Sequence, residues 1–274
     1  MAISTTNYFS NAIVGVPQVG ADVDIYALHK LPKFALGTKF ERQDGAVFRY
    51  ANFGAVNAVG CICGKNANET DNLSALVLTA SAASEQQNGD PIGTYPNAAG
   101  SKYLSCVFAA GTSANQFAGG YVTISGITGV GATYRIKSHT ATGTPSSGHY
   151  LVELYDRLVS SLAATSRISI SGSKFNDLMP SVAGTQSAIV AGVSMVACTT
   201  AGYYGWVQTK GIVGVLSAGT MVSGQPAVVS STSGNVTVFA NVATDANFLP
   251  AVVVGTVVQA GIATGACILN INVD

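Results

Sequence analysis

The sequence predicts an all-β protein built of glycine-rich antiparallel sandwich or barrel modules, with an extended N-terminal arm and at most one short helix. Three observations predict this class. Short runs rich in Val, Ile, Thr and aromatic residues recur along the chain and favour pleated strands. The 31 glycines are spread throughout and suit tight turns and bulges. A credible helical spacing of apolar residues occurs only at 154–162.

The N-terminal residues 1–35 mix scattered large apolar side chains with turn-forming Gly and Pro. This mixture predicts an extended arm that lies on another surface, although an ordinary N-terminal pair of strands would show the same composition. If the segment is an arm, five large side chains are its candidate contacts: Tyr8, Phe9, Ile13, Val14 and Tyr26.

A β-hairpin is predicted next, with strands at 39–42 and 46–50. The pair Asp44-Gly45 separates the two runs, and Gly accepts the positive φ angle that a tight hairpin turn requires. Another strand is expected at 58–63. Residues 64–100 are polar and rich in turn formers except at 76–80, so they predict a surface insertion that carries one strand.

Beyond this insertion, strands are expected at short spacing, with Gly and Ser in the gaps. The expected strands are 103–108, 121–125, 133–138, 150–154, 167–171, 189–195, 205–208, 212–216, 227–230, 236–240, 252–257 and 267–273. This pattern divides the chain into an arm (1–35), a β-rich domain (36–190) with its insertion near 64–100, and a C-terminal barrel-like domain (191–274). One sandwich and tandem barrels both fit the spacing.

Composition narrows the range of functions that this chain could have. Only 9% of residues are charged and the formal net charge is zero, so the basic surplus of a nucleic-acid-binding protein is missing. No apolar run is long enough for a transmembrane helix, and Met1 is not followed by a signal-peptide pattern. The cysteines occupy apolar, strand-like settings, which predicts buried free thiols in a reducing compartment: Cys61, Cys63, Cys106, Cys198 and Cys267.

The sequence contains few residues in patterns typical of catalytic, metal-binding or phosphate-binding sites. The three histidines are not at metal-ligand spacing, and Cys61 and Cys63 lack further ligands nearby. No Gly-x-Ser-x-Gly motif is present, the few acids lie mostly in turns, and the glycines of 126–131 are not followed by the Lys of a phosphate-binding loop. We therefore expect no enzyme, no catalytic residue, no cofactor and no metal site.

Two aromatic residues are candidates for the core or for a subunit interface. Strand alternation places Tyr204 and Trp206 on one face together with Gln208. A core or a subunit interface is the commoner place for such a pair. Exposed aromatic side chains of this kind can instead stack on sugars, and that alternative stays open.

Several ordered motifs carry a resemblance to a known family. The segment Tyr203-Tyr-Gly-Trp-Val-Gln-Thr-Lys-Gly211 and the residues after it resemble tailed-bacteriophage capsid decoration (cement) proteins. Further matching stretches are 37–50, 119–126, 131–139, 154–156, 165–166, 213–216, 224–226, 251–255 and 267–274. Together they extend over most of the chain from residue 36, and the arm and the 64–100 insertion match least.

The resemblance implies a non-enzymatic virion structural protein. It would be made in the host bacterial cytoplasm and would sit on the outer capsid surface as a homotrimer. There it would bridge subunits of the major capsid protein and stabilise the shell, with no direct contact to nucleic acid or membrane. The alternative is a glycan-binding head-fibre or adhesin domain on the virion surface. A hydrolase acting on host surface polymer ranks third.

Overall fold

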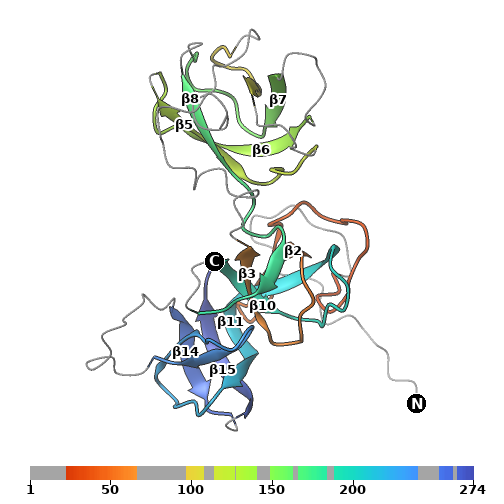
Figure 1. The fold of residues 1–274 in the computed structure, drawn as a ribbon, viewed down its shortest axis with the longest axis vertical. Coiled ribbons are helices and arrows are strands. Elements are labelled where there is room, and N and C mark those ends of the chain that lie inside the picture. Colours follow the sequence, from red (N-terminus) through yellow and green to blue (C-terminus); the bar gives the residue numbers. More distant parts are fainter. Residues whose placement is uncertain are drawn as a thin grey trace. The chain divides into compact units, whose positions relative to one another are not determined.

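The protein is described by a computed structural model that covers residues 23–66, 97–107, 114–126, 128–140, 149–162, 166–183, 188–239, 253–261 and 264–274 (Figure 1). These residues form strands and no helix, so the predicted all-β class is confirmed. The strands are β1 (Lys39–Glu41), β2 (Val47–Phe53), β3 (Ile62–Asn66), β4 (Tyr103–Val107), β5 (Tyr121–Gly126), β6 (Thr133–His139), β7 (His149–Leu154), β8 (Arg167–Ser171), β9 (Leu178–Pro180), β10 (Ala188–Ser194), β11 (Tyr203–Ala218), β12 (Pro226–Val229), β13 (Val236–Val238), β14 (Val253–Gln259) and β15 (Thr264–Asn272).

The chain forms two compact units, and the first is discontinuous. Unit 1 contains Met1–Asn66 and Lys174–Asp274, and unit 2 contains Ala67–Ser173. The division at residue 190 that the sequence suggested differs from this arrangement. The reason is long-range pairing, because β2 pairs with β11 and β3 pairs with β9 and β10. Unit 2 is therefore an insertion between two parts of unit 1.

The first part of unit 1 is a closed ring of strands. β2, β9, β3, β10 and the first half of β11 pair in that order, and β11 pairs back onto β2. The hairpin predicted around Asp44-Gly45 is present, with Gly45 at a φ of 80°. Apolar side chains fill the ring, among them Phe53, Cys63 and Val207. We call this ring the first barrel.

The second half of β11 belongs to another ring. It pairs with β13 and β15, and β12 and β14 complete the circuit. The interior is filled mainly by aliphatic side chains such as Val215, Leu269 and Ile271. We call this ring the second barrel. β11 is thus one 16-residue strand shared by both barrels, with a register shift between Gln208 and Lys210.

Residues 23–40, which we call the covering segment, cover the outer side of β2 and β11. Ile25 is buried there, and Val23 and Phe34 are partly buried, against Tyr50 and Trp206. Residues 23–35 therefore do not form the extended arm that was predicted to lie on another surface. They pack on their own unit, because β2 carries aromatic residues on both faces. Residues 1–22 lie outside the described part of the chain.

Unit 2 contains a five-stranded antiparallel sheet in the order β4-β7-β6-β5-β8. Its strands mostly alternate, so even-numbered residues such as Val122, Ile136 and Ile168 face a buried core and odd-numbered residues face outward. A register shift after Ile136 reverses this order at the end of β6, where His139 is buried. This alternation is the pattern from which the strands were predicted.

The predicted helix at 154–162 is wrong. Leu154 ends β7, and the chain continues without regular structure. The backbone amide of Leu158 donates to the carbonyl of Ser101, and that of Leu162 donates to Asn97, both at 2.8 Å. These leucines still pack on the same core, and that common packing is the reason for their helix-like spacing.

The predicted insertion at 64–100 is divided in the structure. Residues 64–66 complete β3, residues 97–100 belong to unit 2, and the strand expected at 76–80 lies outside the described residues. The short strand β9 was not predicted, because Leu-Met-Pro shows neither alternation nor length.

Candidate functional site

The structure describes only one of the predicted arm residues. Tyr26 is 55% exposed, and its backbone amide donates to Asp24 Oδ1 at 2.9 Å in a turn of the covering segment. Tyr8, Phe9, Ile13 and Val14 lie outside the described residues. Tyr26 is therefore available to a partner, whereas the neighbouring Ile25 is part of the core.

The two aromatic residues predicted for the core or an interface, Tyr204 and Trp206, have different environments. Trp206 is only 1% exposed and meets Tyr50 edge-on, with 5.2 Å between ring centroids. Tyr204 is half-buried and stacks on the same Tyr50 at 6.2 Å. Trp206 therefore belongs to the core of unit 1 and has no open ring face on which a sugar could stack.

Reactive groups are scarce among the described residues, and no cluster of three or more metal-ligating side chains occurs there. Cys61 and Cys63 lie with their Sγ atoms 3.8 Å apart, both buried in the first barrel. The hydrogen bond to Cys61, together with burial, raises the pKa of the Cys63 thiol well above its ordinary value. Such a thiol is a poor nucleophile at neutral pH. In the described parts of the chain, no helix has the length and apolar character to span a membrane.

The most unusual property of unit 1 is the lack of charge in the second barrel. From Gly211 to Val273 the sequence contains one charged residue, Asp245, which lies outside the described residues. A globular protein of ordinary composition would have about a quarter of its residues charged. The surface of this barrel is therefore formed by hydroxyl, amide, backbone and apolar groups.

The outward residues of β11, β15 and β14 form one continuous surface. Ile212 lies opposite Asn270, and Gly214 lies opposite Ile268, while the residues between them point into the barrel. Ile212 is 56% exposed. We call this surface the uncharged face, and it consists of Ile212, Gly214, Thr256, Gln259, Ala266, Ile268 and Asn270.

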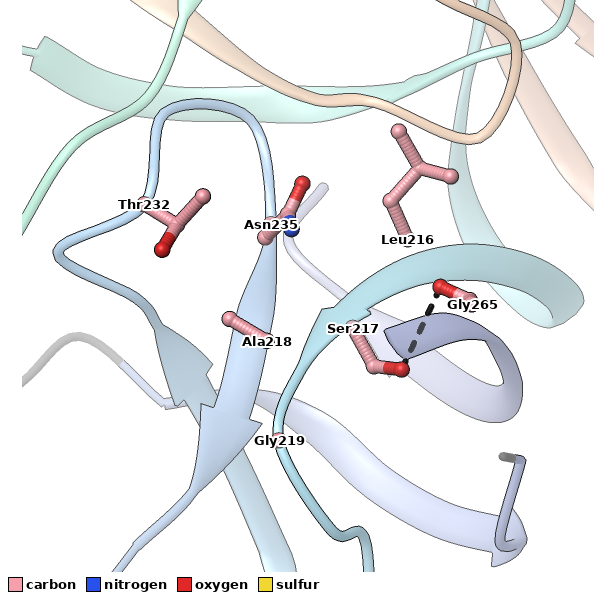
Figure 2. A pocket seen from close by; sticks show the side chains of 7 residues that line it. All are labelled: Leu216, Ser217, Ala218, Gly219, Thr232, Asn235 and Gly265. Carbon is pink, nitrogen blue, oxygen red and sulfur yellow. Dashed lines mark hydrogen bonds between the residues drawn. The ribbon is translucent and has the colours of Figure 1, made fainter. Parts of the chain in front are cut away.

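A shallow hollow lies at one end of the same strands (Figure 2). It has a volume of about 570 Å³, and small, uncharged residues line it: Leu216, Ser217, Ala218, Gly219, Thr232, Asn235 and Gly265. Ser217 Oγ donates to the Gly265 carbonyl at 3.3 Å, so the ends of β11 and β15 are tied together there. The hollow could accept a small uncharged side chain, and it contains no group suited to acid–base chemistry.

The described ion pairs of unit 1 lie away from the uncharged face. Lys39 pairs with Glu41 at 2.7 Å, and Arg42 pairs with Asp44 in the first hairpin. Arg49 holds the Asp274 carboxylate through two hydrogen bonds of 2.7 and 3.0 Å, which lowers the pKa of that carboxyl. These paired charges lie on β1, β2, their turn and the C-terminal Asp274. One further charge borders the uncharged face, because the exposed Lys210 precedes Ile212 on the same side of β11 and lies opposite Asn272.

The sequence contains a signal for the uncharged face in its distribution of charge rather than in a motif. The long interval without charge, together with the alternation of 212–216 and 267–273, marks one outward surface without ionised groups. The pairing of β11 with β15 could not be foreseen, and it is this pairing that joins the two runs into one face.

In comparisons with known proteins, no family model, curated protein or solved structure matches this chain significantly.

Proposed function

We propose that this protein is a non-enzymatic structural protein of a tailed-phage virion. In this proposal it decorates the outer surface of the capsid and bridges subunits of the major capsid protein. The uncharged face of the second barrel is the single observation that carries the proposal, and the sequence resemblance to cement proteins supplies the partner.

Removing the uncharged face from water costs little free energy. A buried charge without a partner costs several kcal/mol, whereas apolar groups gain free energy when they are buried. Ile212 and Ile268 offer apolar area, while Asn270 and Thr256 offer hydrogen-bonding groups. A face of this composition can dock on a protein shell without having to match charges.

A homotrimer would strengthen such docking. Three copies attached together raise the avidity without a strong individual contact, because the second and third contacts form within one complex. A three-fold module also matches the local three-fold axes of a shell. Bridging then stabilises the shell, since rupture has to break the added interfaces as well.

Co-sedimentation with capsids that lack a decoration protein tests the proposal. Ile212→Lys places a charge on the uncharged face, and Val56→Lys places one at a similarly exposed position in the connection between β2 and β3. Both side chains are more than half exposed, so the fold should tolerate either substitution. We expect Ile212→Lys to weaken capsid binding at least tenfold and Val56→Lys to leave it unchanged. Equal binding of the two variants would contradict the role of this face, and no binding by the wild type would contradict the function.

The N-terminal residues form a second part of the proposal. Tyr8, Phe9, Ile13 and Val14 supply apolar groups that could contact the shell. Deletion of residues 1–22 is expected to lower capsid affinity and leave the oligomer intact in analytical ultracentrifugation. Unchanged affinity would restrict the contact to the second barrel.

A further inference from the structure

Unit 2 presents an outward surface that is the chemical opposite of the uncharged face. It combines half-exposed tyrosines with charged side chains on the outer side of the five-stranded sheet. We call this surface the tyrosine face, and it consists of Tyr103, Tyr121, Arg135, Lys137, Glu153 and Tyr155.

Strand register brings these residues next to one another. Tyr103 on β4 lies opposite Glu153 on β7, and Tyr121 on β5 lies opposite Arg135 on β6. Tyr155 follows β7, and its backbone amide donates to the carbonyl of Arg135 at 3.0 Å. The three tyrosines thus span the four adjacent strands β4, β7, β6 and β5. Neighbouring strands are about 4.8 Å apart, so the side chains on them are close enough to bind one ligand.

The charged groups between the tyrosines are held in fixed positions. Lys137 Nζ donates to Glu153 Oε1 at 2.7 Å, and Ser138 Oγ donates to Glu153 Oε2 at 2.9 Å. The Arg135 guanidinium lies 5.0 Å from the ring centroid of Tyr155 and orients that ring. The face is therefore a preformed set of donors, acceptors and aromatic rings.

The three tyrosine rings of this face are too exposed to belong to the core of unit 2. Tyr103 and Tyr121 are each 49% exposed and Tyr155 is 40% exposed, whereas Tyr134 on the opposite side of the sheet is buried. The inward residues of the same strands already fill the core. Grouped exposed aromatic residues of this kind indicate an interaction surface.

We propose that the tyrosine face binds a neutral polysaccharide. Tyrosine rings offer flat apolar surfaces for the C–H faces of sugar rings, and each keeps a hydroxyl for hydrogen bonding. The Lys137–Glu153 pair supplies a donor beside an acceptor, which matches neighbouring sugar hydroxyls that both donate and accept. This inference is independent of the proposed capsid role, because it concerns the other unit of the chain.

The same residues argue against other occupants. On this face Lys137 is already paired with Glu153, so little positive charge is left to neutralise the phosphates of a nucleic acid. A second copy of the chain would have to remove four charged groups or their ion pairs from water: Arg135, Lys137, Glu153 and the outward Arg167 of β8. A hydrated sugar chain can leave these groups partly in contact with water.

An array of printed neutral and acidic oligosaccharides tests the inference with the whole 274-residue chain. Concentration series are compared for the wild type, Tyr155→Ala, Tyr103→Ala, Glu153→Gln and the control Tyr26→Ala, which removes an exposed tyrosine of unit 1. Neutral oligosaccharides should be bound by the wild type and the control. Binding should fall at least tenfold in either tyrosine variant of the face, and at least threefold in Glu153→Gln, which keeps the shape of the side chain.

Circular dichroism melting of each variant shows whether unit 2 is still folded, and Glu153→Gln provides an answer even if a tyrosine variant unfolds. Four results would overturn the inference. They are no oligosaccharide binding by the wild type, binding that the face substitutions leave unchanged, preference for acidic sugars or oligo-dT, and loss of self-association in place of sugar binding.

Discussion

At the scale of single residues, Trp206 connects the covering segment to the first barrel. Its indole lies between Phe34 and Tyr50, with ring centroids at 5.4 and 5.2 Å, and Phe40 is 6.0 Å away. Removing a buried tryptophan leaves a large cavity, so we expect Trp206→Ala to reduce the free energy of unfolding by about 3–5 kcal/mol. Urea denaturation measures this loss.

The matched control is Tyr26→Ala, which removes an exposed ring from the same covering segment. It should change the free energy of unfolding by less than about 0.5 kcal/mol. Similar losses in the two variants would mean that the covering segment is not anchored through Trp206.

His139 gives unit 2 a defined pH dependence. Its Nε2 accepts the backbone amide of Phe117 at 2.9 Å, so Nδ1 carries the proton and donates to the Thr140 carbonyl at 2.8 Å. Burial lowers the pKa of this histidine, because the folded unit favours the neutral ring. Its contribution to stability is therefore complete above the unfolded-state pKa of about 6.5 and declines as the pH falls below it.

Thermal unfolding of unit 2 between about pH 8 and pH 5 should show this decline. His139→Gln should lower the stability of unit 2 at every pH and make that stability depend much less on pH. His29, whose pKa is also lowered, belongs to unit 1 and remains in both proteins, so the difference between them isolates His139. An identical slope in the variant would disprove the assignment.

At the scale of elements, two glycines of the second barrel differ in the space around them. A Cβ at Gly255 in β14 would collide with the Asn270 carbonyl oxygen and lie 2.9 Å from the Cα of Ile271. A Cβ at Gly214 in β11 would meet nothing within 4 Å. The β14–β15 pair therefore requires glycine at position 255.

Gly255→Ala is expected to destabilise unit 1 by about 1–3 kcal/mol through steric overlap. Gly214→Ala should stay within about 0.5 kcal/mol of the wild type. Chemical denaturation of the two variants compares them directly, and equal stability would show that β14 and β15 are not paired in this register.

Most strands could be predicted because their alternation is local. β5, β6 and β8 carry buried even-numbered residues, and the Asp44-Gly45 turn specifies its own hairpin. β11 was predicted as two strands because Thr209-Lys210-Gly211 interrupts the apolar pattern. In the structure a bulge at this point lets one strand continue from the first barrel into the second.

At the scale of the whole molecule, the two units have separate cores. The cluster around Ile136 contains only residues of unit 2, and the three other clusters contain only residues of unit 1. Calorimetry should therefore resolve two transitions. Trp206→Ala should lower the midpoint temperature of one transition, and Ile136→Ala that of the other. A single transition that shifts in both variants would show that the units unfold together.

The division into units and the location of the contact surfaces could not be predicted from local patterns. The sequence gives no sign that β3 pairs with β9, more than a hundred residues later. It also places Trp206 and Tyr121 in similar predicted strands, although Trp206 is buried and Tyr121 is exposed. Burial depends on what covers a strand, and the covering segments come from distant parts of the chain.

The central claim is that the uncharged face of the second barrel docks on a viral shell. A cryo-EM map of decoration-free capsids incubated with the protein tests it most directly. We expect density for three copies around local three-fold axes, with β11 and β15 of each second barrel against the major capsid protein. A shell without added density, or a second barrel that faces solvent, would contradict it.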